Sequence, residues 1–436
     1  MRKKISPNSL YKLCIEETAF HLLEKFWKRK NTNPFSQVNC NIVNDLFQFL
    51  VLNMDIEKPS PLKLLLKSGQ LQDLVLDGVD FTEEQWESLM TILLEEADSC
   101  RNITYILLPE SFQNDENSLE RLVEKCPLLE RLDVSTFFNL SALKNSKMLQ
   151  NHPKLVSLGI TDSSWAAHHI YTTCKMDTVP RFGLKECFWG FNRNVDIFNG
   201  NQIAYTQQYP EFVKSSVVLF PLVEKLCIVV YHEDCIQHLK KLKHLRVLEI
   251  DFSSCCCSPA RTAFISLLSE IGPQLKRLSI VGRSTMPVDV VMKYCSNVVR
   301  LDLRCSAIVQ GGIETDSNNF RHLKKLIVIG MDEESLEYLL RNSLNLKELL
   351  LVEALCWDDT LLHKIFKKNS LSQVNTIAVH ECRLSREGLK ELVQKCVNLE
   401  KIAFETLDAD LTSVAKELNR DIRATYSYVE RNLIGI

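Results

Sequence analysis

The residues of this chain that could do chemistry are its cysteines and one pair of histidines. The 436-residue sequence holds 16 cysteines, of which Cys255, Cys256 and Cys257 are adjacent, and it places His168 next to His169. Tetrahedral metal sites usually take separated pairs of ligands, so we expect a loop of small residues and an exposed helix turn here instead. The sequence also has no phosphate-binding glycine loop, nucleophile elbow or zinc-protease helix motif. We therefore predict a protein that is not an enzyme and uses no cofactor and no metal.

Composition narrows the class of protein further. Apolar residues make up 45% and charged residues 25% of the chain, which is the balance of a globular protein, and the net charge of −3 suggests neither nucleic acid nor a membrane as partner. We find no apolar run long enough to span a membrane and none of signal-peptide length after the basic N-terminus. We therefore expect a cytoplasmic or nuclear protein with reduced cysteines.

A short pattern that recurs along the chain indicates the elements that would position any binding residues. In each copy an apolar residue is followed by two variable residues, a second apolar residue, one variable residue and a third apolar residue. About thirteen frames of this pattern begin at Leu71, Ile103, Leu129, Leu155, Leu184, Val223, Leu245, Leu275, Val298, Leu323, Leu346, Val374 and Leu399. The starts lie 22 to 39 residues apart, and most of these intervals fall within the roughly 20–29-residue period of leucine-rich repeats.

The spacing predicts an α/β leucine-rich-repeat solenoid, or horseshoe. The fourth and sixth positions of each frame would point inward from a strand, and the segments between frames have apolar residues at helical spacing. Each unit is then a strand, a turn and a helix, and neighbouring units bury one another's apolar faces. We expect two parts: a helical segment over residues 1–60 and the solenoid of about 13 repeats over residues 61–436.

Several predicted helices end in a cysteine just before the next strand. Cys100, Cys126, Cys295 and Cys396 each lie three residues before a frame. This arrangement resembles the cysteine-containing subclass of leucine-rich repeats, which is common in substrate receptors of ubiquitin ligases. We interpret these thiols as small groups that pack at a tight corner.

The third position of each frame should face the solvent on the inside of the curve. In consecutive repeats this position holds Lys225, Val247, Arg277, Arg300 and Lys325, and acidic residues such as Glu249 and Asp302 stand close by. One interpretation is charge pairing between repeats on a solvated sheet. The other is a substrate-binding surface for an acidic or C-terminal segment of a partner protein.

The longest interval between frames runs from Leu184 to Val223 and is rich in Asn, Gln and aromatic residues, including Tyr205 and Tyr209. We expect a loop-like insertion. Its aromatic side chains could anchor an interface or pack the insertion against its own repeats.

A separate helix is predicted at the front of the chain, over "SPNSLYKLCIEETAFHLLEKFWKRK", residues 6–30. It has an apolar face that includes Leu10, Leu13 and Cys14, and something must cover that face. One possibility is that the helix caps the first repeat, because terminal repeats need a polar outer cap.

The residues of this helix also resemble the elongin-binding box of ubiquitin-ligase receptors. In that family a leucine inserts into a pocket on Elongin C, and a small residue four positions later lies beside it. The resemblance assigns these roles to Leu10 and Cys14, with Leu13 next to them, and Thr18 stands where the family has an aliphatic residue. The following "VNCNIVNDLFQFL" resembles the cullin-contacting box, through Val38, Ile42 and Leu46, with Asn39 at the family's proline position.

The order of these segments resembles the Zyg-type leucine-rich-repeat substrate receptors of elongin–cullin ubiquitin ligases. The resemblance implies a non-catalytic receptor that binds Elongin B, Elongin C and a cullin, and holds a protein substrate on its repeats. An alternative is an F-box-like receptor that binds Skp1 through Ile42, Leu46 and Phe47. A third is a plain leucine-rich-repeat scaffold. None of these patterns identifies the substrate.

Overall fold

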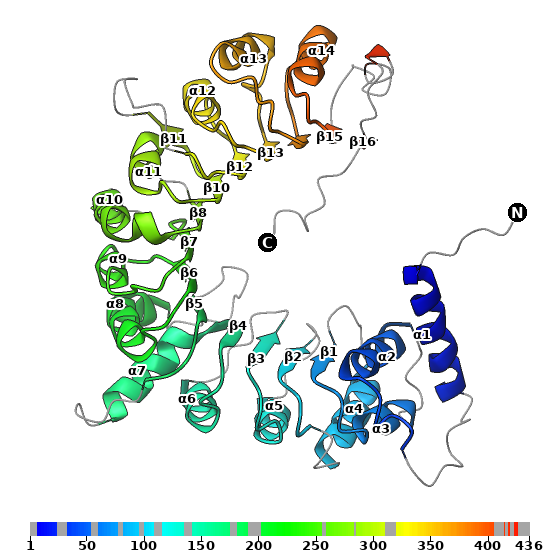
Figure 1. The fold of residues 1–436 in the computed structure, drawn as a ribbon. Helices are drawn as coiled ribbons and strands as arrows, with labels where there is room; N and C mark the ends of the chain where they lie inside the picture. Colours follow the sequence, from blue (N-terminus) through cyan, green and yellow to red (C-terminus); the bar gives the residue numbers. More distant parts are fainter. Residues whose placement is uncertain are drawn as a thin grey trace, which may run out of the picture. The chain divides into compact units, whose positions relative to one another are not determined.

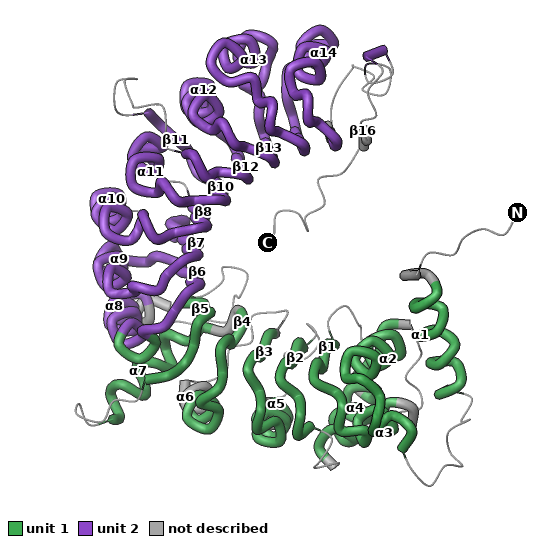
Figure 2. The backbone as a smooth tube through the Cα atoms, viewed as in Figure 1, with its two compact units in different colours: residues 1–197, 218–220 green, residues 198–217, 221–436 purple. Residues whose placement is uncertain are grey.

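The computed structural model shows the chain as a series of strand–helix units (Figure 1). It describes residues 7–23, 33–53, 60–76, 82–95, 100–108, 116–134, 142–174, 181–190, 202–254, 259–282, 285–309, 320–404, 414, 417–418 and 423–425. The chain forms two compact units, which Figure 2 distinguishes by colour. Unit 1 comprises Met1–Ile197 with Val218–Phe220, and unit 2 comprises Phe198–Val217 with Pro221–Ile436.

Unit 1 begins with three helices and continues as a parallel sheet covered by helices. The helices are α1 (Pro7–Leu23), α2 (Cys40–Asn53), α3 (Ser60–Leu66), α4 (Glu83–Glu95), α5 (Glu116–Glu124), α6 (Ala142–Asn151) and α7 (Ser163–Thr173). The strands are β1 (Asp73–Val75), β2 (Tyr105–Leu108), β3 (Arg131–Val134), β4 (Ser157–Asp162) and β5 (Glu186–Trp189). Each strand pairs in parallel with the next one along the chain.

Unit 2 repeats the same arrangement. Its helices are α8 (Gln202–Leu219, whose last residues belong to unit 1), α9 (Asp234–Leu239), α10 (Pro259–Ile271), the 3-10 helix η4 (Gly272–Gln274), α11 (Val288–Tyr294), α12 (Glu333–Arg341), α13 (Asp359–Phe366) and α14 (Arg386–Lys395). Its main sheet is formed in order by β6 (Lys225–Val229), β7 (Val247–Asp251), β8 (Arg277–Val281), β10 (Arg300–Arg304), β12 (Lys325–Ile329), β13 (Glu348–Val352), β14 (Thr376–Val379), β15 (Lys401–Phe404) and β16 (Arg423–Thr425). A second, two-stranded sheet joins β9 (Met286–Pro287) and β11 (Ala307–Ile308).

These strands confirm the predicted repeat. Each of the thirteen frames is followed, two residues after its start, by the first residue of a strand. The fourth and sixth positions whose side chains the structure describes are buried as expected; in β8 these are Leu278 and Ile280, both 0% exposed. The protein is therefore an α/β leucine-rich-repeat solenoid. Strand β16 has no matching frame and was not anticipated.

Most of the turns that lead into the strands have one backbone hydrogen bond in common. The N–H of the first frame residue donates to the carbonyl three residues earlier, as from Leu129 to Cys126 at 3.0 Å and from Val298 to Cys295 at 3.1 Å. The four cysteines predicted at this corner are all 0% exposed. Burial raises the pKa of the Cys295 thiol to about 12. These thiols are packing groups, as the sequence indicated.

A row of side-chain amides also ties neighbouring turns together. The residue just before several frames is an asparagine that donates through Nδ2 to a backbone carbonyl of the preceding repeat. The pairs are Asn102 to Gly69 (2.6 Å), Asn297 to Pro273 (2.7 Å), Asn345 to Arg321 (2.7 Å) and Asn398 to Ser372 (2.8 Å). The sequence signal for this amide ladder was the recurrence of Asn one residue before a frame. The frame pattern begins one residue later and therefore did not include it.

Helix α2 covers the first strand of the sheet. The side-chain oxygen of Asn44 accepts hydrogen bonds from the backbone N–H groups of Gln72 and Asp73, at 3.1 and 3.3 Å. Its Nδ2 donates to the Asp73 carboxylate at 2.9 Å. An uncovered edge strand would present unpaired backbone groups, so α2 supplies the cap that a terminal repeat needs.

The prediction of a loop-like insertion is partly wrong, because α8 occupies residues 202–219. Tyr209, Phe212, Val213 and Val217 recur at helical spacing and are all at most 5% exposed. Pro210 lies inside this helix, and together with the many Asn and Gln residues it obscured the helical pattern. The earlier part of the insertion, from residue 191 to residue 201, lies outside the described residues.

Candidate functional site

The opening helix α1 packs on the rest of unit 1 through one of its faces. Figure 1 shows α1 beside α2, and its inner face consists of Ile15, Ala19 and Leu22, which are 7%, 0% and 4% exposed. The hydroxyl of Tyr11 adds a polar contact by donating to the Asp45 carboxylate of α2 at 2.5 Å. This hydrogen bond, helped by burial, raises the pKa of Tyr11 to about 12.

The opposite side of α1 is apolar but exposed. Leu10, Leu13 and Phe20 are 57%, 51% and 55% exposed, and Cys14 is exposed as well. At about 100° per residue these four side chains lie on one side of the helix, opposite Ile15 and Ala19. We call Leu10, Leu13, Cys14 and Phe20 the outer face of α1. A helix with two apolar faces, one of them uncovered, presents the kind of surface that marks a binding site.

The polar residues of α1 pair within the helix. Lys12 lies 3.9 Å from Glu16, and His21 lies 3.4 Å from Glu17. The Thr18 hydroxyl donates to the Cys14 carbonyl at 2.7 Å. The hydroxyl that replaces the family's aliphatic residue is therefore satisfied by the helix itself.

The three residues of the predicted cullin-contacting segment do not share an exposed surface. Val38 is half-buried in the turn before α2, Ile42 is 36% exposed, and Leu46 is 1% exposed. Phe47, which the F-box alternative requires, is 0% exposed. Only Ile42 among these side chains is a surface residue.

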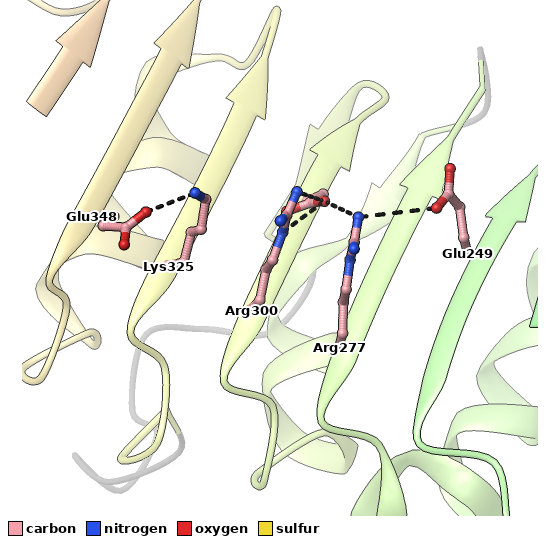
Figure 3. Close-up of polar contacts among 6 residues, drawn as sticks. Glu249, Arg277, Arg300, Lys325 and Glu348 are labelled. Atoms are coloured by element: carbon pink, nitrogen blue, oxygen red, sulfur yellow. Dashed lines mark hydrogen bonds and ion pairs between the residues drawn. The ribbon is translucent and has the colours of Figure 1, made fainter. Parts of the chain in front are cut away.

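The predicted row of third-position residues exists and is in register across unit 2. Lys225 pairs with Val247, Val247 with Arg277, Arg277 with Arg300, and Arg300 with Lys325 on successive parallel strands. Figure 3 shows Arg277, Arg300 and Lys325 engaged by acidic side chains. Lys325 lies 2.6 Å from Glu348, and Arg277 lies 4.0 Å from Glu249.

The Asp302 carboxylate is the centre of this charge row. Its side chain is 0% exposed and accepts two ion pairs, at 3.2 Å from Arg277 and 2.9 Å from Arg300. Nε of Arg300 also donates to both of its oxygens, at 2.9 and 3.1 Å. Charge pairing between repeats therefore describes Arg277 well, whereas Arg300 pairs with the acid of its own strand. Lys225, at the end of the row, is exposed.

The aromatic residues of α8 take part in internal packing. Tyr209 is 0% exposed and meets the ring of Tyr231 edge-on at 4.9 Å between centroids. The backbone of Tyr205 lies in α8, but its side chain falls outside the described residues. For Tyr209 the structure thus shows the packing alternative.

The histidines and cysteines singled out in the sequence form no metal centre in the part of the chain that the structure describes. Within those ranges, no group of three or more His, Cys, Asp or Glu side chains is placed to hold a metal ion. His168 and His169 are half-buried in α7 rather than in an exposed turn, and all of Cys255–Cys257 lie outside the described ranges. No helix among the described residues has the length and apolar character needed to cross a membrane.

Comparisons with known proteins give structural neighbours alone. No protein-family model matches the chain, and no curated protein matches it. A Bacteroides fragilis protein of solved structure aligns with 58% of this chain and 77% of its own, at 15% identity and a TM-score of 0.36. The leucine-rich repeat-containing protein LegL7 from Legionella pneumophila aligns over 66% and 86%, at 12% identity and a TM-score of 0.33. A structure of the yeast Rad7 and Elc1 complex aligns over 68% and 90%, at 12% identity and a TM-score of 0.24.

Proposed function

We propose that this protein is a non-catalytic substrate receptor of an elongin–cullin ubiquitin ligase. In this proposal the outer face of α1 binds Elongin C, which is joined to Elongin B, and the repeats hold a protein substrate. The main support is the exposure of Leu10, at 57%, beside Leu13 and Cys14. These are the residues that the elongin-box resemblance assigns to the adaptor.

The geometry of unit 1 favours an adaptor role over a purely capping role for α1. Asn44 of α2 already occupies the backbone groups of Gln72 and Asp73 at the edge of the sheet. Helix α1 lies on α2 through Ile15, Ala19 and Leu22, so the outer face adds nothing to the cap. Exposed apolar side chains at this density are costly to leave in water, and a partner that covers them would remove that cost.

The same exposures favour an elongin over Skp1. An F-box-like site would need Leu46 and Phe47 at the surface, and both are at most 1% exposed. Binding of Skp1 through these residues would require α2 to leave its place on the first repeat. A cullin contact through Ile42, with Val38 at its border and Leu46 supporting the helix from inside, needs no such change.

For the substrate, the charge row on the strands is the proposed contact surface. Binding an acidic segment there would replace internal ion pairs by ion pairs to the partner. The residues concerned are Arg277 and Arg300, which now pair with Asp302, and Lys325, which now pairs with Glu348. Lys225 is the most accessible member of the row. The ligase role implies that the protein works in the cytoplasm or nucleus.

Co-expression tests the adaptor proposal directly. The tagged full chain would be produced with Elongin B and Elongin C, and in parallel with Skp1, and purified. We expect stoichiometric recovery of both elongins, and loss of both from Leu10→Asp. Leu355→Asp is the matched control, because Leu355 is 52% exposed but lies in the repeats of unit 2.

Two results would overturn the proposal. One is recovery of Skp1 in place of the elongins, which would favour the F-box-like alternative. The other is recovery of neither adaptor by a chain with native circular dichroism, which would leave a leucine-rich-repeat scaffold. Both variants change exposed positions, so we expect their stability to stay within about 0.5 kcal/mol of wild type.

A further inference from the structure

One rim of unit 2 carries a run of positive charge that the charge row on the strands does not include. The turns before the strands β7, β8, β10, β12 and β13 occupy residues 241–246, 271–276, 294–299, 320–324 and 342–347. These five segments contain no Asp or Glu. They contain seven lysines and arginines, namely Lys241, Lys243, Arg246, Lys276, Arg321, Lys324 and Lys347, together with His244 and His322. We call these nine residues the basic rim.

The backbone holds the basic rim as a continuous line. The N–H of Lys276 donates to the carbonyl of Arg246 at 2.7 Å, and the N–H of Lys347 donates to the carbonyl of Lys324 at 2.8 Å. Val299 links the two pairs, since it donates to Lys276 and accepts from Lys324. Adjacent strands lie about 4.8 Å apart, so the line from β7 to β13 spans about 19 Å.

The cations of the basic rim differ from those of the charge row in their partners. All seven are exposed, and none forms an ion pair within the part of the chain that the structure describes. The one side-chain hydrogen bond that these cations make to described residues joins Arg246 to the Gln274 carbonyl at 3.3 Å. By contrast, Arg277 and Arg300 are occupied by the buried Asp302. The rim therefore carries positive charge that carboxylates of the described residues do not engage, unlike Arg277 and Arg300 of the charge row.

We propose that the basic rim binds an acidic segment of a partner protein, in an extended conformation along the turns. An extended chain carries side chains on one side about every 6.6 Å, so its carboxylates can reach cations on the turns to either side of the uncharged Val299. Leu344, 49% exposed, stands within the last of the five segments, so the rim also offers an apolar contact beside Lys347. An acidic segment that includes an apolar side chain would use both.

The surroundings of the rim favour a protein over a nucleic acid. Single-stranded nucleic acids bind where aromatic rings accept stacked bases. The only aromatic side chains in the five segments are Phe320, which is 0% exposed, and Tyr294, which is half-buried beneath the Lys293 ammonium. The amides of Asn297 and Asn345 each commit one N–H to a backbone carbonyl of the preceding repeat.

The experiment uses the full chain and a labelled peptide of about ten glutamates with one central leucine. At about 3.3 Å per residue, the extended peptide is long enough to cover the rim from β7 to β13. Binding would be followed by fluorescence anisotropy at low and at physiological ionic strength. The rim variant combines Lys276→Glu, Lys324→Glu and Lys347→Glu. Its control combines Arg101→Glu, Lys147→Glu and Lys154→Glu in unit 1, which changes the net charge equally at exposed positions.

We expect salt-dependent binding that the rim variant weakens by about tenfold or more and the control by less than about threefold. Equal losses in the two variants, or no binding by the wild type, would refute the proposal. So would tighter binding of a thymidine oligonucleotide or of phosphatidylserine vesicles, since the rim would then serve a different polyanion. The test is independent of the adaptor proposal, because a Leu10→Asp chain should bind the peptide as the wild type does.

Discussion

Arg277 on β8 and Asp302 on β10 form an ion pair of 3.2 Å in which the carboxylate is completely buried. The two residues are not opposite each other in the register, since Arg277 stands beside Arg300 and Asp302 beside Ser279. The pair is therefore diagonal, and Arg300 closes it from the same strand as Asp302. Arg277 and Arg300, which the sequence placed in one basic row, thus share the Asp302 carboxylate that lies between them.

The first prediction concerns this buried carboxylate. Asp302→Ala should lower the free energy of unfolding by about 3–5 kcal/mol, because it leaves two guanidinium groups without their shared partner. Glu348→Ala is the comparison, since it breaks the exposed pair with Lys325 and should cost about 0–1 kcal/mol. Urea titrations followed by circular dichroism would measure both. Similar losses for the two variants would show that Asp302 is not a structural centre of the row.

The second prediction compares Asn345 of the amide ladder with Asn369, a buried asparagine that also donates to the preceding repeat. Asn345 is exposed and donates one hydrogen bond to Arg321, so Asn345→Ala should cost about 1 kcal/mol. Asn369 is 6% exposed, and its amide donates to the carbonyls of Leu340 and Ser343 at 2.6 and 3.2 Å. Its Oδ1 also accepts from the Leu371 N–H at 3.0 Å. Because Asn369→Ala removes these three hydrogen bonds at a buried position, it should cost about 1–3 kcal/mol. The order of the two urea midpoints is the test, and a greater loss at Asn345 would contradict it.

The third prediction concerns His152, which occupies the corner position that Cys126 holds in the preceding repeat. It is 6% exposed, and it lines a crevice between α5 and α6 with Glu120, Glu124 and Lys147. Burial holds the pKa of His152 below its ordinary value of 6.5, against an opposing effect of Glu124. The unfolded chain then binds a proton more readily than the folded one, so stability should fall as the pH drops below about 6.5.

His152→Cys is the variant that tests this expectation. The difference in unfolding free energy between variant and wild type should be constant between about pH 7 and 8, below the range in which the unfolded thiol ionises, and should move in favour of the variant between about pH 6.5 and 5. Burial also lowers the pKa of His238, but that histidine is present in both chains and cancels in the difference. A difference that does not change with pH would show that His152 is protonated equally in the two states.

The repeat could be predicted from the sequence because buried strand positions recur at a fixed spacing. Leu278, Leu301 and Leu326 stand opposite one another on successive strands, and the solenoid cannot form without apolar residues there. The same periodicity placed Arg277 and Arg300 in one row. It could not show that Asp302 is buried between them, because that depends on how two long side chains fold over the sheet.

The sequence was least informative where a residue has two possible environments. Leu10 and Ile15 both read as apolar residues of one helix, and only their packing shows that Leu10 is exposed and Ile15 is covered. Helix α8 was missed because Pro210 interrupts its pattern. The basic rim was also missed. Its charges lie just before the strands, at residues that precede a frame or at the variable second position of one, and the apolar pattern that defines the repeat does not include these positions.

The last prediction uses the two faces of α1 as each other's control. Ile15→Ala removes a side chain that is 7% exposed, and it should cost about 2–4 kcal/mol because a cavity is left between α1 and its support. Leu10→Ala shortens a side chain that is 57% exposed, and its effect should stay within about 0.5 kcal/mol. Limited proteolysis with mass spectrometry, which detects release of the first helix, would measure the difference together with thermal unfolding. If Leu10→Ala destabilised the helix as much as Ile15→Ala, the outer face would be part of the fold, and its exposure would no longer support an adaptor site.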